Sequence, residues 1–116
     1  MNYGTIFLDI DGTIIKHRGD LYSMITKEAE IIEGTIQKLI EWKQKGYNII
    51  LTTARPEGTR KQTEHQLSEL GIFYHRLIMN LSSGPRIVIN DTKPDGTVTA
   101  IAHPIKRNSG IKNIQL

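Results

Sequence analysis

Three short apolar runs, each ending in polar or acidic residues, constrain the fold of this 116-residue chain more than any other feature. The runs cover residues 3–10, 47–53 and 86–90. Continuous apolar runs of this length are typical of strands that are buried on both faces of a parallel sheet. Such sheets bind ligands at the carboxyl ends of their strands, so the polar residues at these ends predict a functional site.

Two helical patterns follow the first two runs. Apolar residues recur at helical spacing over residues 36–43, and Gly46 then supplies a stop signal. Thr59 opens a capping-box pattern, which predicts a second helix ending near Leu70. The alternation predicts an α/β fold, a three-layer sandwich with a mainly parallel, Rossmann-like sheet. We expect two more strands, at residues 77–79 and 97–103.

Length and composition fit one globular domain covering residues 1–116, with 38% hydrophobic and 23% charged residues. The absence of cysteine excludes disulfides and thiolate metal sites. No apolar stretch reaches the 18 or so residues of a membrane span, and the first residues do not read as a signal peptide, so we expect a cytoplasmic location. The net charge of +3 is spread along the chain, and we interpret it as surface charge rather than as a nucleic-acid interface.

Acidic residues stand at the ends of two of the apolar runs. Asp9 and Asp11 are two residues apart, so their side chains point the same way in an extended chain, and we expect Asp91 to join them from another strand. Two carboxylates about 4 Å apart repel by roughly 4 kcal/mol at an effective dielectric near 20, and a divalent cation removes this repulsion. Because the available ligands are all oxygens, we expect Mg²⁺ held by these three residues.

This arrangement suits phosphoryl transfer. A carboxylate that faces a phosphate can attack phosphorus and form an aspartyl-phosphate, while a neighbouring carboxylate transfers the protons. Gly12 permits a tight turn after the acids, Thr13 offers a hydroxyl there, and Thr53 is expected to bind a phosphoryl oxygen. We interpret Gly12, Thr13, Ala54 and Arg55 as substrate-binding residues, with ion pairing an equal alternative for Arg55.

The same runs carry three motifs in a familiar order. DIDGT resembles the first motif of the haloacid dehalogenase-like (HAD) superfamily, ILTTAR resembles its second motif, and VIND resembles its fourth. The resemblance spans residues 6–91 and implies a phosphatase in which Asp9 is the nucleophile and Asp11 the acid/base. It also implies that Thr53 is a catalytic phosphate ligand and that Asp91 and the backbone carbonyl of Asp11 bind the metal.

The third motif departs from this pattern. The superfamily usually places a lysine after the strand that precedes the last acid, but this chain reads NLSSG at residues 80–84. Lys93 follows Asp91 by two residues, whereas Arg86 opens the predicted strand and is expected about 13 Å from the active edge. We therefore assign the catalytic cation to Lys93 and keep Arg86 as the alternative.

No insertion long enough for a cap domain follows Asp9 or separates Thr53 from Asp91, so we expect an open site that is compatible with a homodimer. Specificity would then come from the flap at residues 14–20, from the tail or from a partner subunit. We interpret His103 and Lys106–Asn108 in the tail as surface residues, with a position at the active edge as the alternative. The predicted substrate is a small phosphorylated metabolite, such as a sugar phosphate or a nucleotide. Two alternatives stay open, a non-catalytic module that binds a phosphorylated ligand and a phosphatase of nucleic-acid 3′ ends.

Overall fold

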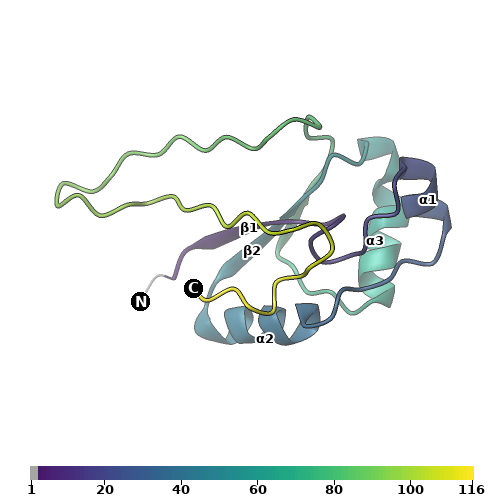
Figure 1. The fold of residues 1–116 in the computed structure, drawn as a ribbon, viewed down its shortest axis with the longest axis horizontal. Helices are drawn as coiled ribbons and strands as arrows, with labels where there is room; N and C mark the ends of the chain where they lie inside the picture. The colour runs from purple at the N-terminus through teal and green to yellow at the C-terminus, as the bar shows by residue number, and fades with distance from the viewer. Residues whose placement is uncertain (1–2) are drawn as a thin grey trace.

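Three parallel strands form the sheet of the computed structural model, which describes residues 3–116 (Figure 1). They are β1 (Thr5–Asp9), β2 (Asn48–Thr52) and β3 (Arg76–Ile78), in the order β1-β2-β3. The register pairs Asp9 with Thr52 and Thr52 with Ile78, so the three carboxyl ends lie side by side. The strands predicted at residues 3–10, 47–53 and 77–79 are confirmed, within one or two residues at their ends.

Helices connect the strands. The short α1 (Leu21–Thr26) and then α2 (Thr35–Lys45) lie between β1 and β2, and the turn η1 (Glu57–Thr59) and α3 (Arg60–Glu69) lie between β2 and β3. The helix predicted from periodicity (α2) and the helix predicted to end near Leu70 (α3) are therefore both confirmed. The capping box predicted at Thr59 is wrong, because its hydroxyl donates to the carbonyl of Pro56 and makes no cap hydrogen bond. No helix among residues 3–116 is long and apolar enough to cross a membrane.

The core lies on one face of the sheet. Side chains alternate along a strand, and on this face the buried residues of the strands meet those of α2 and α3. They include Leu8, Ile49, Leu51 and Leu77 from the strands and Leu39, Trp42 and Leu67 from the helices. On the other face, Phe7 is 64% exposed and Ile78 is 41% exposed. The predicted α/β fold with a parallel, Rossmann-like sheet and no cap domain is confirmed.

Residues 85–103 leave this body as a long extended arm, and the tail at residues 104–116 returns to it (Figure 1). The arm turns back at its tip, where the N–H of Lys93 donates to the Thr97 carbonyl at 3.0 Å. The strands predicted at 86–90 and 97–103 are not formed. The reason is the connection: only residues 79–85 separate β3 from Arg86, whereas a crossover to a parallel strand needs a dozen residues or more.

Candidate active site

The loop after β1 is wound tightly around one carbonyl. The N–H groups of Thr13, Ile14 and Ile15 all donate to the Ile10 carbonyl at 3.0–3.1 Å. Gly12 makes this turn with a φ of 91°, a left-handed conformation that other residues rarely adopt. The turn folds Thr13 back toward the end of β1, where its hydroxyl donates to Asp9 Oδ2 at 3.4 Å.

Asp9 is the most accessible carboxylate of the site, with 45% of its side chain exposed. Burial of the rest raises the pKa of Asp9 above its ordinary value, and the nearby guanidinium of Arg86 opposes this effect. The Arg86 Nη2 atom lies 3.5 Å from Asp9 Oδ1. An exposed carboxylate with one cation beside it is positioned to meet an anionic ester from solvent.

Asp11 has a different environment. Both of its oxygens accept hydrogen bonds from Arg55, Nε at 2.9 Å and Nη2 at 2.8 Å. Arg55 is only 3% exposed, and its Nη1 donates to Thr63 at 3.1 Å and Gln66 at 2.8 Å. Of the two alternatives for Arg55, the structure shows ion pairing, because the guanidinium faces Asp11 and α3. The substrate-binding role given to Arg55 is not what this geometry shows.

Thr53 directly follows β2, one residue beyond Thr52, which pairs with Asp9 in the sheet. Its Oγ1 accepts the backbone N–H of Arg55 at 3.1 Å, and its own N–H donates to the Ile78 carbonyl at 3.0 Å. Thr53 is only 2% exposed, and its hydroxyl hydrogen has no acceptor among residues 3–116, so a ligand oxygen that reached this buried end of β2 would satisfy it. Ala54 is exposed at the same edge.

The arm carries Asp91 and Lys93 away from the acids of its own chain. Arg86 lies at the base of the arm beside Asp9, and the tip points toward the amino end of β1 (Figure 1). The expectation that Asp91 and Lys93 reach this edge from a parallel strand of the same chain is therefore wrong. Arg86, the alternative, is the cation found beside Asp9, because the chain enters the arm from the carboxyl edge of the sheet.

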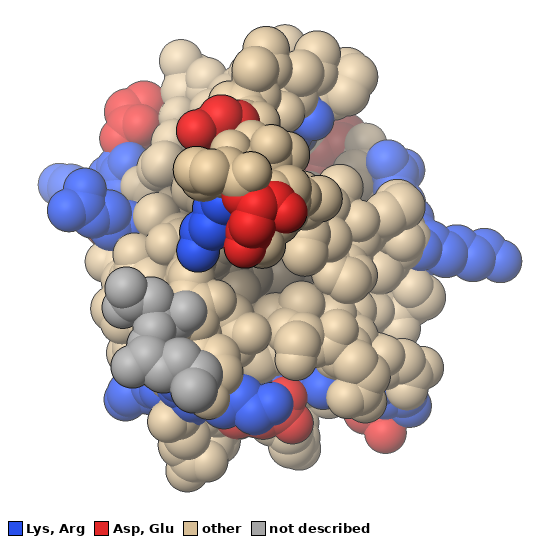
Figure 2. Space-filling model, turned by 90° about the vertical axis from the view of Figure 1, so that its left-hand side faces the viewer, with Lys and Arg blue, Asp and Glu red and all other residues tan. Residues whose placement is uncertain are grey.

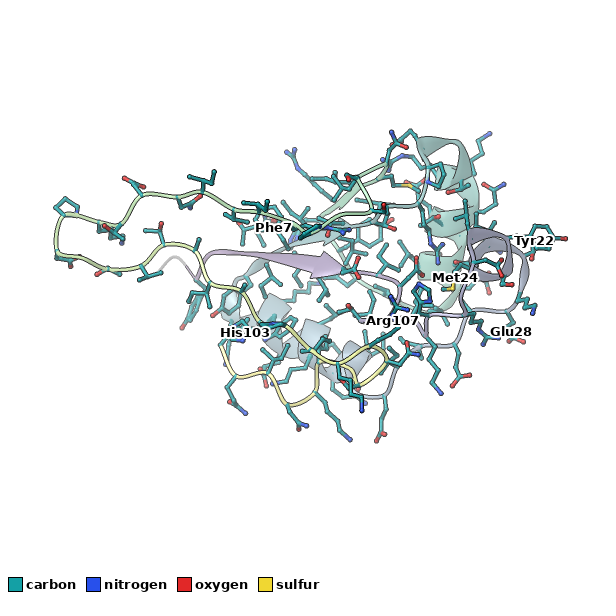
Figure 3. All side chains as sticks on the ribbon, turned by 45° about the horizontal axis from the view of Figure 1, so that its top comes forward. Phe7, Tyr22, Met24, Glu28, His103 and Arg107 are labelled. Carbon is teal, nitrogen blue, oxygen red and sulfur yellow. The ribbon has the colours of Figure 1, made fainter. Side chains whose placement is uncertain are left out.

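Arg107 is a candidate site residue that we interpreted as surface charge. The N–H of Asn108 donates to the Gly12 carbonyl at 2.7 Å, which holds the tail against the loop of the site. A side-chain atom at Gly12 would lie 3.2 Å from Arg107 Cγ, so this arginine covers the turn, and Figure 3 shows it near the end of β1. Ile111 of the tail is fully buried and packs the tail onto the body, a contact that no periodic pattern in the sequence indicates.

The oxygen donors at this edge are of the kind that Mg²⁺ binds, but too few carboxylates come together there. The Asp9 oxygens accept only long contacts, from Thr13 at 3.4 Å and Arg86 at 3.5 Å, whereas those of Asp11 accept from Arg55 at 2.8–2.9 Å. Among residues 3–116, no group of three acidic or histidine side chains is close enough together to hold a metal ion. The described residues of a single chain therefore bring too few carboxylates together to enclose a Mg²⁺ ion by themselves.

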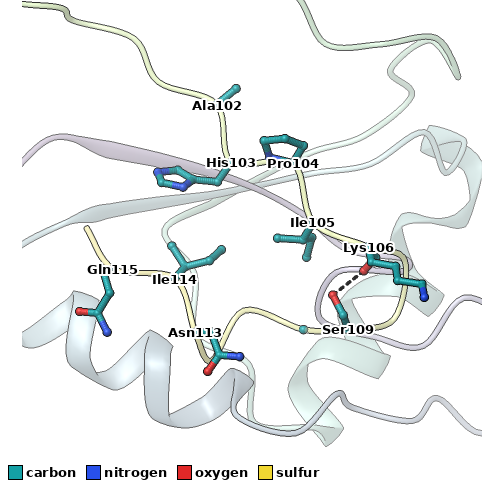
Figure 4. A pocket seen from close by; sticks show the side chains of 10 residues that line it. Ala102, His103, Pro104, Ile105, Lys106, Ser109, Asn113, Ile114 and Gln115 are labelled. Atoms are coloured by element: carbon teal, nitrogen blue, oxygen red, sulfur yellow. Dashed lines mark hydrogen bonds between the residues drawn. The ribbon is translucent and has the colours of Figure 1, made fainter.

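A separate, open groove lies between the tail and the end of the arm (Figure 4). His103, Ile105 and Ile114 are among the residues that line it, and none of the acids of the site does. Figure 4 shows one hydrogen bond across its end, from Ser109 to the Lys106 carbonyl at 2.6 Å. The groove is thus distinct from the site around Asp9.

Comparison with protein families identifies a model that matches most of the chain. The family model described as "PITM 1-3, LNS2 domain" matches residues 6–103, most of the chain and all three strands of the sheet. The LNS2 domain has a phosphatase-type, HAD-like fold. None of the curated proteins compared matches the chain.

Solved structures with similar folds include two of an RNA-repair assembly. The chain is 28% identical to a chain of the Pnkp1/Rnl/Hen1 complex, with a TM-score of 0.60, and 29% identical to a chain of the Pnkp1/Rnl/Hen1 RNA repair complex, with a TM-score of 0.59. These matches cover 74% and 72% of this chain but only 31% and 27% of those chains. This chain thus spans about a third of their length.

A third structure, a structural-genomics target from Vibrio cholerae, matches along the whole chain. The match covers 100% of this chain and 91% of that one, with a TM-score of 0.59. Its 19% identity shows a shared fold alone.

Proposed function

Because the chain belongs to the LNS2 domain family, with its phosphatase-type, HAD-like fold, we propose that it is a Mg²⁺-dependent phosphatase that hydrolyses phosphate monoesters through Asp9. One observation carries the proposal. An exposed carboxylate, Asp9, lies at the carboxyl edge of a parallel sheet with a hydroxyl from Thr13 and a guanidinium from Arg86 directed at it. Ligands of such sheets bind at this edge.

Each residue of the edge has a role in the proposed reaction. An Asp9 oxygen attacks phosphorus, the bond to the ester oxygen breaks, and the phosphoryl group is held as an aspartyl-phosphate. Asp11 gives a proton to the leaving alcohol and takes one from the water that releases inorganic phosphate. Each Asp11 oxygen keeps a lone pair beyond the one that accepts from Arg55, so the ion pair orients Asp11 without using all its capacity.

Thr53 and Arg86 serve the phosphoryl group. The free hydroxyl hydrogen of Thr53 donates to one of its oxygens, and the Arg86 guanidinium offsets the charge that gathers on the others. Asp9 and the Asp11 backbone carbonyl would hold Mg²⁺, which would supply further neutralisation of the phosphate charge. Gly12, Thr13 and Ala54 lie at this edge, where their backbone can come close to the substrate.

The substrate we propose is a small phosphorylated metabolite, because the site has no cap and Asp9 is open to solvent. A second candidate is the phosphate at the 3′ end of a nucleic acid. Similarity to chains of an RNA repair complex, at 28–29% identity, favours it, as do two arginines, Arg86 and Arg107, beside the site. Phosphorylated oligonucleotides and small phosphate esters tested side by side distinguish the two.

The test is hydrolysis of an aryl phosphate with and without Mg²⁺. We expect metal-dependent release of phosphate by the wild type and loss of at least about 1,000-fold in Asp9→Asn, since the nucleophile is removed. Glu28→Gln is the matched control, because Glu28 is an exposed acid beyond α1, far from β1 in Figure 3. Equal activity in Asp9→Asn contradicts the proposal, and phosphate-ester binding without turnover in the wild type supports the non-catalytic module instead.

A further inference from the structure

The arm presents apolar side chains to solvent along both of its sides. Five of them are 62% to 91% exposed, and Ile89 is the most exposed. Chains rarely leave so many large apolar residues uncovered on an extended segment, since such segments recruit a binding partner or aggregate. The five residues are Ile87, Val88, Ile89, Val98 and Ile101.

The chain exposes more surface to solvent than a compact monomer of its mass does. Its accessible surface is 7895 Å², whereas a compact monomer of 13.1 kDa exposes about 6,400 Å². Its radius of gyration is 14.7 Å, against about 13.4 Å for a compact chain of this length. The excess of about 1,500 Å² per chain is enough to form a stable dimer interface, which needs about 800 Å² from each partner.

A matching surface lies on β1. This strand is at the edge of the sheet and pairs only with β2 within residues 3–116, so its outer backbone groups are open to another strand. Phe7 is exposed on the uncovered face of β1, near the base of the arm in Figure 3, and exposed Ile78 lies on the same face of the sheet. An open edge flanked by apolar side chains is suited to an added strand.

The chain's own arm is not placed to bring its tip to the site. Its base is fixed at the site, with Arg86 3.5 Å from Asp9, and it runs from there toward the amino end of β1 (Figure 1). At about 3.3 Å per residue, Asp91 lies roughly 16 Å along the arm from Arg86. In a two-fold pair with the arms side by side, the arm of a second copy runs the opposite way and points its tip at this site.

We propose that two copies of this chain exchange arms, so that the arm of each lies along β1 of the other and delivers Asp91 to the other's Asp9. Residues 86–93 extend about 26 Å, longer than the five residues of β1, so the tip reaches the carboxyl edge. The tip carries Asp91, Lys93 and Asp95, all exposed, and it stands in the foreground of Figure 2 as a group of charged side chains. The sheet edge it meets carries Arg86 and Arg107.

Arm exchange supplies the carboxylate that the site of a single chain lacks. The Mg²⁺ site of a single chain is short of a carboxylate, and the second copy's Asp91 is the acid that completes it. This part of the proposal rests on the proposed phosphatase function. The dimer itself does not, because it follows from the exposed arm and the open strand edge.

The first test is the mass in solution, by light scattering over a range of concentrations. We expect twice the 13.1 kDa of one chain for the wild type and a single-chain mass for the double variant Ile87→Ser/Ile89→Ser. Ile40→Ser, which changes an exposed isoleucine of α2, is the matched control and stays dimeric. Circular dichroism verifies that the variants are folded. A monomeric wild type, or a dimer that the arm variant leaves unchanged, overturns the proposal.

The second test asks whether the arm crosses between chains. The protein has no cysteine, so single cysteines can be introduced as Phe7→Cys in one tagged chain and Ile89→Cys in another. After the two are mixed, a short bis-maleimide reagent should link the differently tagged chains. Cross-links only within a Phe7→Cys/Ile89→Cys chain would show that each arm folds onto its own body, which contradicts exchange.

Mixed dimers test the catalytic part. Asp9→Asn and Asp91→Asn are each expected to be inactive alone, while their mixture recovers about a quarter of the wild-type activity, since half of the dimers are mixed and hold one intact site each. No recovery, or full activity of Asp91→Asn alone, refutes the delivery of Asp91 to the partner. If no phosphate ester is hydrolysed by the wild type, the proposed function fails, and the mass and cross-links still decide arm exchange.

Discussion

The guanidinium of Arg55 holds the carboxylate of Asp11 at two points, with Nε 2.9 Å from Oδ2 and Nη2 2.8 Å from Oδ1. The pair joins the loop that follows β2 to the loop that follows β1, and Arg55 Nη1 extends the connection to Gln66 on α3. Gln66 in turn donates to the Met24 carbonyl of α1 at 2.6 Å. One buried guanidinium thus ties the proposed acid/base to both helices beside it.

Replacing Arg55 with alanine should destabilise the protein by about 3–5 kcal/mol, because it leaves Asp11 without its partner in a largely buried site. Activity should fall with it, since Asp11 loses its orientation. Arg55→Lys keeps the charge but not the two-point geometry, so its stability and activity should lie between those of the wild type and those of Arg55→Ala. Urea denaturation monitored by circular dichroism measures the change.

Arg60→Ala is the matched control for this prediction. Arg60 is an arginine of α3 with a third of its side chain exposed, paired with Glu57 and Glu64 at the surface. Pairs of this kind contribute about 0–1 kcal/mol. If Arg55→Ala and Arg60→Ala changed the free energy of unfolding by the same amount, the buried pair would have no special role.

Asp9→Asn should make the protein more stable at neutral pH while abolishing turnover. Burial raises the pKa of Asp9 in the folded state, so ionisation of Asp9 opposes folding, and stability falls as the pH rises from the ordinary value of 3.8 through the raised folded value. Asparagine removes this cost. The gain should be present above that window and vanish below pH 3.8. Thermal unfolding of both proteins without metal, between pH 3 and pH 7, measures it, and a pH-independent difference would contradict the assignment.

The local part of the fold could be predicted from sequence because its signals are local. The end of β1 at Asp9, the stop at Gly46 and the pairing of the ends of β1 and β2 just before Thr53 all follow from periodicity and strand order, and the structure shows each of them. The position of Arg86 beside Asp9 could be predicted too. The seven residues between β3 and Arg86 are too few for a crossover, which forces Arg86 to remain at the carboxyl edge.

The non-local part could not be predicted. Residues 86–90 have the apolar composition of a buried strand, yet composition does not say which chain covers them, and in this structure nothing does. Arg107 reaches the site because the tail packs around fully buried Ile111, a contact with no periodic pattern in the sequence. The pairing of Asp11 with Arg55 joins residues 44 apart and was one of two alternatives until the fold was known.

Thr53→Val should lower kcat by about 10²–10³-fold, whereas Thr53→Ser should stay within about tenfold of the wild type. Valine has the same shape but lacks the hydroxyl that is free to donate to a phosphoryl oxygen. It also leaves the buried N–H of Arg55 without its acceptor, a loss of about 1–3 kcal/mol in stability. Steady-state kinetics with an aryl phosphate and urea denaturation measure the two effects. Equal kinetics for the serine and valine variants would exclude Thr53 as a phosphate ligand.

The cap of α1 should be sensitive to pH. Asp20 accepts the backbone N–H of Ser23 at 2.8 Å and its hydroxyl at 3.1 Å, and these hydrogen bonds lower the pKa of Asp20. A lowered folded pKa means that the stabilisation is present above the ordinary value of 3.8 and is lost as the pH falls through the lower folded value. Asp20→Ala should therefore exchange the amide hydrogens of Leu21–Thr26 faster at pH 6, with little difference from the wild type at pH 2.

Asp20→Asn separates the cap from its charge. Asparagine caps helices as well as aspartate does, so the protection of the α1 amides against exchange should stay high at pH 6 and should no longer change with the protonation of residue 20. Because Gln66 links α1 to Arg55, Asp20→Ala should also loosen the amide of Arg55, while the asparagine variant should not. Faster exchange confined to α1 in Asp20→Ala would show that the helix and the buried pair fluctuate independently.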